Sequence, residues 1–193
     1  MDIDLWYPKD DNFELIGFSN ADFSGCEVER KNTSGTCHFL GHSLVSWYSK
    51  KQNSIALSTA KAEYIVVDLC CAQILWMKQT LSDFGLSFEQ VSIKCDNISV
   101  ISISKNLIQH SRTKHIEIIH HFLRDRAQNG DITLEIVSTK DQLADIFTKP
   151  LSEKQFVDIR RQLGVISLWF NVCLWMLDVY VYWLLELHDI CII

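Results

Sequence analysis

The succession of predicted strands and helices places this sequence in the mixed α/β class, with one sheet and helices packed on it. Three segments rich in β-forming residues come first, and helical and strand-like segments alternate after them to about residue 164. The 193 residues are 48% hydrophobic and 22% charged. This composition excludes a disordered polyelectrolyte, and the length suffices for one domain with a substantial core.

The first three strands are expected at 14–23, 36–40 and 44–49. The stretch 29–35 (ERKNTSG) is typical of a turn, and Gly41 separates the last two strands. Because the connections are short, the three strands are predicted to pair as an antiparallel meander.

A long helix follows, from Ala60 to about Leu81, because its apolar residues recur at spacings of three and four. Ser58 or Thr59 can cap its start, and Gly85 ends it.

Two further strands and four shorter helices complete the prediction, which gives a five-stranded mixed sheet flanked by helices. Their approximate ranges are 91–95 and 132–137 for the strands, and 97–105, 114–129, 139–149 and 152–163 for the helices. Capping residues are present at three of the helix starts: Asp96 or Asn97, Thr139 with Gln142, and Ser152 with Gln155.

The seven cysteines are odd in number and form no C-x-x-C pair. This pattern argues against a disulfide framework or a zinc site and favours reduced thiols in an intracellular protein. The acidic N-terminal segment has no apolar run behind a basic start, so no signal peptide is expected. We therefore expect a cytoplasmic or nuclear location.

Residues 165–193 differ in composition from the rest of the chain. They contain 23 apolar residues in 29 and no Lys or Arg, whereas all 18 Lys and Arg lie before them. We therefore divide the chain into a lead-in (1–13), a domain (14–164) and a hydrophobic, helical tail (165–193).

The tail has three interpretations. Residues 165–185 are long enough to span a membrane, with Arg160 and Arg161 before them as a cytoplasmic-side signal, although Asp178 near the centre opposes insertion. Alternatively, the tail is a hydrophobic helix packed on the sheet or on a partner. In the third interpretation it is translated sequence that is selected for no function.

Three carboxylates lie on separate predicted elements: Glu63 in the first turns of the long helix, Asp96 directly after a strand, and Asp145 in a short helix. Each alone has a simpler explanation, as a helix cap, a favourable charge at a helix start or a solvated side chain. Together they suggest convergence on a hard cation such as Mg²⁺, which prefers carboxylate oxygens.

Seven motifs then carry a resemblance to a known family. They are GFSNADFSG (17–25), RKNTSG (30–35), VSWYSKKQ (45–52), ALSTAKAEY (56–64), CDN (95–97), HSRTKHIEI (110–118) and QLADIFTKPL (142–151). In this order and spacing they resemble the ribonuclease H domain of copia-type retrotransposon Pol polyproteins, over about residues 14–164 and as a C-terminal piece of such a polyprotein.

The resemblance implies the ribonuclease H fold and endonucleolytic cleavage of the RNA strand in RNA/DNA hybrids during reverse transcription. It also implies two Mg²⁺ or Mn²⁺ ions held by four carboxylates, one ion generating the attacking hydroxide and the other stabilising the leaving oxygen. Glu63, Asp96 and Asp145 match three of these carboxylates. The reverse transcriptase portion of the polyprotein is the implied protein partner.

The fourth position departs from the family, whose first-strand motif is usually S-D-A-D. Here it reads Ser19-Asn20-Ala21-Asp22. Asparagine offers one neutral oxygen in place of two anionic ones, so we predict that Asn20 impairs catalysis or leaves a catalytically inactive, hybrid-binding relic. Asp22 faces the same side of the strand, roughly 7 Å further on. The alternative is that Asp22 compensates by supplying the carboxylate that Asn20 lacks.

Cationic residues supply the expected nucleic-acid contacts. By the resemblance, Lys50 and Lys51, and then Arg112, Lys114 and His115, border the hybrid groove. Phosphate contact is the functional interpretation. For Lys50 and Lys51 an ordinary solvated turn is an equal alternative.

Overall fold

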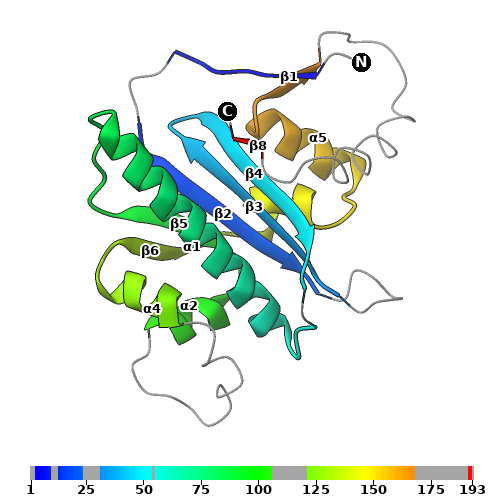
Figure 1. The fold of residues 1–193 in the computed structure, drawn as a ribbon. Coiled ribbons are helices and arrows are strands. Elements are labelled where there is room, and N and C mark those ends of the chain that lie inside the picture. The colour runs from blue at the N-terminus through cyan, green and yellow to red at the C-terminus, as the bar shows by residue number, and fades with distance from the viewer. Residues whose placement is uncertain are drawn as a thin grey trace.

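The structure is a computed structural model that describes residues 3–9, 13–23, 31–53, 55–105, 121–167 and 191–192. Its centre is a mixed sheet with the strand order β6-β5-β2-β3-β4, and the two-residue β8 (Cys191–Ile192) pairs with β4 at the edge (Figure 1). The α/β class and the five-stranded mixed sheet predicted from the sequence are confirmed.

The first three strands form the predicted antiparallel meander. They are β2 (Leu15–Asp22), β3 (Thr33–Leu40) and β4 (Ser43–Lys51). The prediction of a turn through residue 35 was wrong by three residues, because β3 begins at Thr33, opposite Asp22. Ladder pairing with β2 satisfies the backbone of 33–35, and this outweighs the turn propensity of their side chains.

The other two strands are parallel to β2. β5 (Val91–Cys95) pairs with β2, and β6 (Ile132–Ile136) pairs with β5. Parallel neighbours require crossover connections, which helices supply here. In Figure 1, α2 and α4 lie at the β5–β6 side of the sheet, and α5 lies at the β4 side.

Apart from α4, whose predicted start near residue 114 lies outside the described residues, the α-helices begin near the predicted capping residues. They are α1 (Thr59–Asp83), α2 (Ile98–Lys105), α4 (His121–Gln128) and α5 (Glu153–Gln162). Ser58 Oγ accepts a hydrogen bond from the backbone N–H of Lys61 at 3.2 Å, and Ser152 Oγ accepts one from Gln155 at 3.4 Å. These two caps confirm the sequence pattern.

The segment 139–149, predicted as one short helix, is instead two 3₁₀ turns, η2 (Thr139–Asp141) and η3 (Leu143–Phe147). Gln142 lies between them in an extended conformation and is fully buried. Its side chain donates to the carbonyl of Ser19 at 3.0 Å and accepts from the N–H of Ala144 at 3.3 Å. The bond to Ala144 caps η3 in place of the predicted capping box, and the bond to Ser19 ties the turns to β2.

Two glycines let elements approach the sheet closely on its two faces. A Cβ at Gly17 would lie 2.4 Å from Ile74 Cδ1 of α1, and one at Gly35 would lie 2.6 Å from Thr148 Cγ2 and 2.8 Å from the carbonyl oxygen of Ala144. The cores follow the same division: one joins α1, α2 and α4 to the sheet, and the other joins η3 and α5. Gly35 therefore sets how near η3 comes to β2 and β3.

The predicted lead-in and the first residues of the predicted tail meet in a small separate sheet. β1 (Ile3–Leu5) pairs antiparallel with β7 (Val165–Ser167), and the N–H of Trp6 donates to the carbonyl of Gly164 at 2.8 Å. Residues 168–185 of the predicted membrane span lie outside the described residues. Among the residues that are described, no helix is long and apolar enough to cross a membrane.

Candidate active site

Asn20 lies near the end of β2, directly opposite Gly35 of β3, and is 4% exposed. Its side-chain amide donates to Asp145 Oδ1, and also to Thr148 Oγ1 at 3.1 Å. The residue that replaces the expected carboxylate therefore presents hydrogen-bond donors to the neighbouring acid.

Asp145 is fully buried in η3 and is the acid that Asn20 contacts. Lys149 Nζ lies 3.0 Å from the same oxygen, Oδ1, in an ion pair across one turn. Burial raises the pKa of Asp145, and the hydrogen bond and charge of Lys149 act in the opposite direction. The second carboxylate oxygen, Oδ2, is buried without a hydrogen-bond partner.

Glu63 reaches the site from the first turns of α1 and is 6% exposed. Its Oε1 accepts a hydrogen bond from the backbone N–H of Ala21 at 3.1 Å, and its Oε2 is buried without a partner. Burial raises the pKa of Glu63 to about 8; the Ala21 N–H lowers it, and the charges of Asp96 and Asp145 raise it further. The charges of Asp96 and Asp145 therefore lie near enough to act on Glu63.

Asp96 follows β5 and does not cap the next helix. Asn97 does so, since its Oδ1 accepts from the N–H of Ser99 at 3.0 Å. Asp96 Oδ2 instead accepts a hydrogen bond from Thr139 Oγ1 at 3.3 Å. Asp96 is therefore not the helix cap that the simpler explanation proposed, and capping does not occupy its carboxylate.

Asp22 lies two residues beyond Asn20 on β2 and is half-buried. Burial raises the pKa of Asp22, and the charge of Lys149 lowers it. Asp22 is also one of the charges that raise the pKa of Asp145. Asp22 thus lies at the border of the acidic region, near enough for its charge to act on Asp145.

Two divalent ions would need several unpartnered carboxylate oxygens at this site. Two unpartnered carboxylate oxygens, on Glu63 and Asp145, are the kind of group such an ion would need. The other oxygen of Asp145, Oδ1, however, already contacts both the Asn20 amide and the Lys149 ammonium. Within the described residues, no three His, Cys, Asp or Glu side chains are grouped closely enough to hold a metal ion. As arranged, the site does not fit two cations.

Lys149, Thr148 and Gln142 are residues of the site that the sequence analysis did not single out. The pairing of Lys149 with Asp145 could have been predicted, because the two residues are four apart, the spacing at which opposite charges meet across one helical turn. The role of Gln142 could not, since it depends on a tertiary bond to Ser19.

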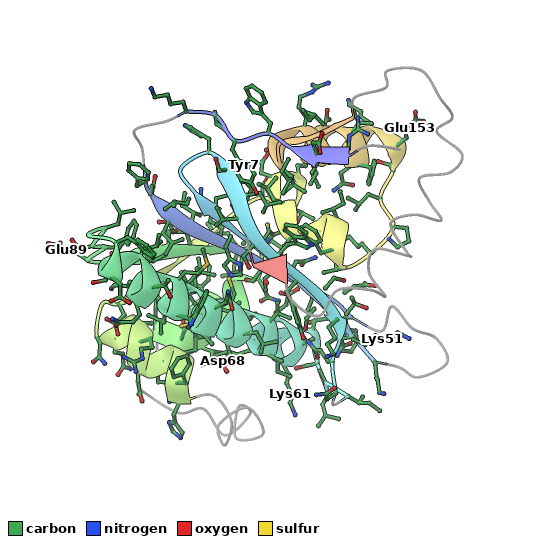
Figure 2. All side chains as sticks on the ribbon, turned by 45° about the horizontal axis from the view of Figure 1, so that its top comes forward. Tyr7, Lys51, Lys61, Asp68, Glu89 and Glu153 are labelled. Atoms are coloured by element: carbon green, nitrogen blue, oxygen red, sulfur yellow. The ribbon has the colours of Figure 1, made fainter. Side chains whose placement is uncertain are left out.

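Lys50 and Lys51 end β4 and are exposed. Ser49, Gly35 and Asn20 lie in register across the three strands, so Lys50 is one residue beyond the row that contains Asn20. Figure 2 shows Lys51 and Lys61 at the end of the molecule opposite to Glu89. The other three predicted contacts, Arg112, Lys114 and His115, lie outside the described residues.

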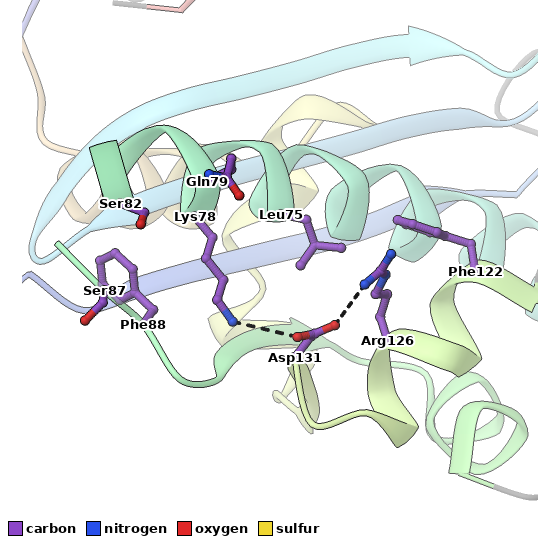
Figure 3. A pocket seen from close by; sticks show the side chains of 9 residues that line it. All are labelled: Leu75, Lys78, Gln79, Ser82, Ser87, Phe88, Phe122, Arg126 and Asp131. Atoms are coloured by element: carbon purple, nitrogen blue, oxygen red, sulfur yellow. Dashed lines mark hydrogen bonds and ion pairs between the residues drawn. The ribbon is translucent and has the colours of Figure 1, made fainter. Parts of the chain in front are cut away.

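A separate pocket of about 400 Å³ lies between the C-terminal half of α1, the segment 87–88 and α4 (Figure 3). Asp131 there forms ion pairs with Lys78 at 3.9 Å and with Arg126 at 3.1 Å. Lys78 is fifteen residues after Glu63 on α1, about 22 Å along the helix. The pocket is therefore remote from the acidic site.

Comparison with known proteins gives relatives for most of the chain. It is 36% identical over 164 residues to the retrovirus-related Pol polyprotein from transposon RE2 of Arabidopsis thaliana, a match that covers 84% of this chain and 11% of that protein. It is 33% identical over 153 residues to the Pol polyprotein from transposon TNT 1-94 of Nicotiana tabacum, covering 79% of this chain and 12% of that one. The chain belongs to the retrovirus-related Pol polyproteins of transposons.

This Pol segment spans about one ninth of the length of the relatives it matches. No protein-family profile matches it. Its fold is similar to the N-terminal RNase H domain of a Mycobacterium tuberculosis protein, with a TM-score of 0.52 and 9% identity over 77% of this chain and 97% of that one. RNase H1 of Halobacterium salinarum gives a TM-score of 0.50 and 13% identity, over 75% and 98%. The fold is therefore ribonuclease H-like, as the resemblance implied.

Proposed function

We propose that this Pol segment is a ribonuclease H domain that binds RNA/DNA hybrids during reverse transcription and whose cleavage of the RNA strand is impaired. The relatives are Pol polyproteins and the fold is ribonuclease H-like, which supports the reaction class. The protein partner we propose is the reverse transcriptase portion of the same polyprotein.

The contact from Asn20 to Asp145 carries the proposal of impairment. In the resemblance, position 20 is a carboxylate that helps to bind two Mg²⁺ or Mn²⁺ ions. Here the side chain is neutral and donates, so it satisfies Asp145 instead of adding to its negative charge. Of the other acids that the resemblance implies, Glu63 accepts a hydrogen bond from the N–H of Ala21, next to Asn20, and Asp96 accepts one from Thr139.

The test compares the full chain with its Asn20→Asp variant on an RNA/DNA hybrid labelled in the RNA strand, with Mg²⁺ and with Mn²⁺. We expect Asn20→Asp to cleave at least about 100-fold faster than the wild type, the scale of effect of one charge-stabilising group in an active site. Asn20→Asp combined with Asp145→Asn should lose this gain. Equal cleavage by wild type and Asn20→Asp would contradict the impairment.

Two further measurements separate the remaining alternatives. If Asp22 substitutes for Asn20, residual wild-type cleavage should disappear in Asp22→Asn. The second candidate function, hybrid binding without cleavage, is favoured by the same Asn20 contact. It predicts that wild type and Asn20→Asp bind the hybrid equally in fluorescence anisotropy and that the wild type shows no residual cleavage. Absence of hybrid binding by both would overturn the proposed function.

A further inference from the structure

Lys149 brings an ammonium group to the edge of the acidic site. Its Nζ lies 3.0 Å from Asp145 Oδ1, while the side chain of Asp145 is 1% exposed and that of Lys149 is 37% exposed. A carboxylate buried to this extent needs a charged or hydrogen-bonding partner to remain ionised. The only cation that the structure places in contact with Asp145, among the described residues, is Lys149.

The position of Lys149 is fixed by the local backbone. Its N–H donates to the carbonyl of Asp145 at 3.3 Å, and Thr148 Oγ1 donates to the same carbonyl at 3.0 Å. Thr148 Oγ1 also accepts a hydrogen bond from the side-chain amide of Asn20. Because Thr148 is tied to Asn20 of β2, the backbone of Lys149 is held one turn after Asp145, within reach of its carboxylate.

The charge of Lys149 acts on two further acids of the site besides Asp145. Burial raises the pKa of Asp22, Glu63 and Asp145, and Lys149 lowers the pKa of each. It thereby stabilises the ionised form of three acids on three different elements. A bound divalent cation would have the same electrostatic effect on the same acids.

Asn20 and Lys149 also converge on one oxygen. Asp145 Oδ1 receives both donors, whereas Asp145 Oδ2 and Glu63 Oε2 receive none. An incoming divalent ion would have to displace the ammonium or share Asp145 with it. Sharing is unfavourable because the two cations would repel each other a few ångströms apart in a buried site.

We propose that Lys149 is the resident cation of this acidic site and takes the place of a divalent ion, so that the folded chain neither needs nor tightly binds one. The inference rests on the proposed function, because it takes this site to be the ribonuclease H site. It explains how buried carboxylates next to the Asn20 amide are stabilised without a bound metal ion.

The test uses the full chain as wild type, Lys149→Met, Lys149→Arg and Lys154→Met, without nucleic acid. Met keeps the length of the lysine stem and removes the ammonium, and Arg keeps the charge. Lys154 is exposed on α5, so Lys154→Met controls for the change in net charge. Each form is unfolded thermally in EDTA and in millimolar Mg²⁺, and its Mn²⁺ affinity is measured from the electron paramagnetic resonance signal of free Mn²⁺.

We expect wild type, Lys149→Arg and Lys154→Met each to unfold at the same temperature in EDTA and in Mg²⁺. In EDTA, Lys149→Met should unfold about 4 °C or more below the wild type, and Mg²⁺ should restore part of this difference. Its Mn²⁺ affinity should exceed that of the wild type about tenfold, because a competing charge has been removed.

Equal Mn²⁺ affinities of wild type and Lys149→Met would overturn the proposal, as would a wild type that Mg²⁺ stabilises as strongly as the variant. If Lys149→Met does not fold in EDTA, the proposal requires that it folds in Mg²⁺, and failure in both counts against it. The proposed function fails separately: it requires hybrid binding, whereas these measurements contain no hybrid.

Discussion

At position 20, one amide changes the electrostatics of the acidic site. A carboxylate there would add negative charge beside Asp145, whose burial already raises its pKa. The Asn20 amide instead donates to Asp145 and to Thr148. Together with the ammonium of Lys149, it favours the ionised form of the buried Asp145.

A second buried residue, His38 of β3, gives the fold a pH dependence of its own. His38 is 1% exposed, its Nε2 lies 3.4 Å from Cys70 Sγ, and burial lowers its pKa to about 4. Between about pH 6.5 and pH 4 the unfolded chain therefore binds a proton here that the folded chain does not. Stability is retained above pH 6.5 and is lost as the pH falls, by about 3 kcal/mol in total.

The measurement is urea unfolding of the wild type, His38→Gln and His42→Gln, each from about pH 7 to about pH 5. We expect His38→Gln to be less stable at pH 7 but to lose less stability than the wild type on acidification. His42 is exposed, so His42→Gln should keep the wild-type slope. The same slope in His38→Gln as in the wild type would mean that His38 is not kept neutral by the fold.

Among the elements, α1 begins with only one of the two side-chain bonds of a capping box. Ser58 accepts from the N–H of Lys61, but the first turn contains no acidic residue and Lys61 places a cation at the positive end of the helix dipole. We expect Lys61→Glu to complete the capping box and raise the free energy of unfolding by about 0.5–1 kcal/mol. Chemical denaturation of both forms measures this.

Lys61→Gln separates the two contributions to this gain. Glutamine can complete the capping box without a negative charge, so its stability should lie between those of the wild type and Lys61→Glu. A Lys61→Glu variant no more stable than the wild type would show that the packing of α1 on the sheet already determines its start.

Element boundaries also show how far local patterns predicted this fold. The ends of α1 and β5 follow apolar spacing and capping residues, so the sequence located them well. The start of β3 and the break at Gln142 depend on partners distant in the sequence, Asp22 and Ser19. Neither could be predicted, because ladder pairing and buried amide bonds have no local sequence signal.

At the scale of the whole molecule, a net charge of −6 coexists with a local cationic end. Lys50 and Lys51 project from the end of β4 beside the row of Asn20, Gly35 and Ser49. This row spans two strand spacings, roughly 10 Å in total. A polyanionic substrate could thus approach the acidic site along a positively charged border even though the chain as a whole is acidic.

If Lys50 and Lys51 contact phosphates, Lys50→Gln with Lys51→Gln should weaken hybrid binding and reduce the slope of log Kd against log salt by about 1–2. Fluorescence anisotropy over a series of salt concentrations measures both quantities. The exposed Lys154→Gln serves as the control and should change neither. An unchanged slope in the double variant would favour the alternative that these lysines are an ordinary solvated strand end.

The sequence by itself determined the α/β class and the family, because these follow from short-range patterns and contiguous motifs; the three acids that it named remain a prediction. Only the tertiary structure decided what Asn20 does, since an amide can accept or donate and its neighbours set which. Likewise, the role of Gln142 and the close approach at Gly35 come from segments more than a hundred residues apart that pack together. The fold thus turns a missing carboxylate into a donor and places Lys149 beside it.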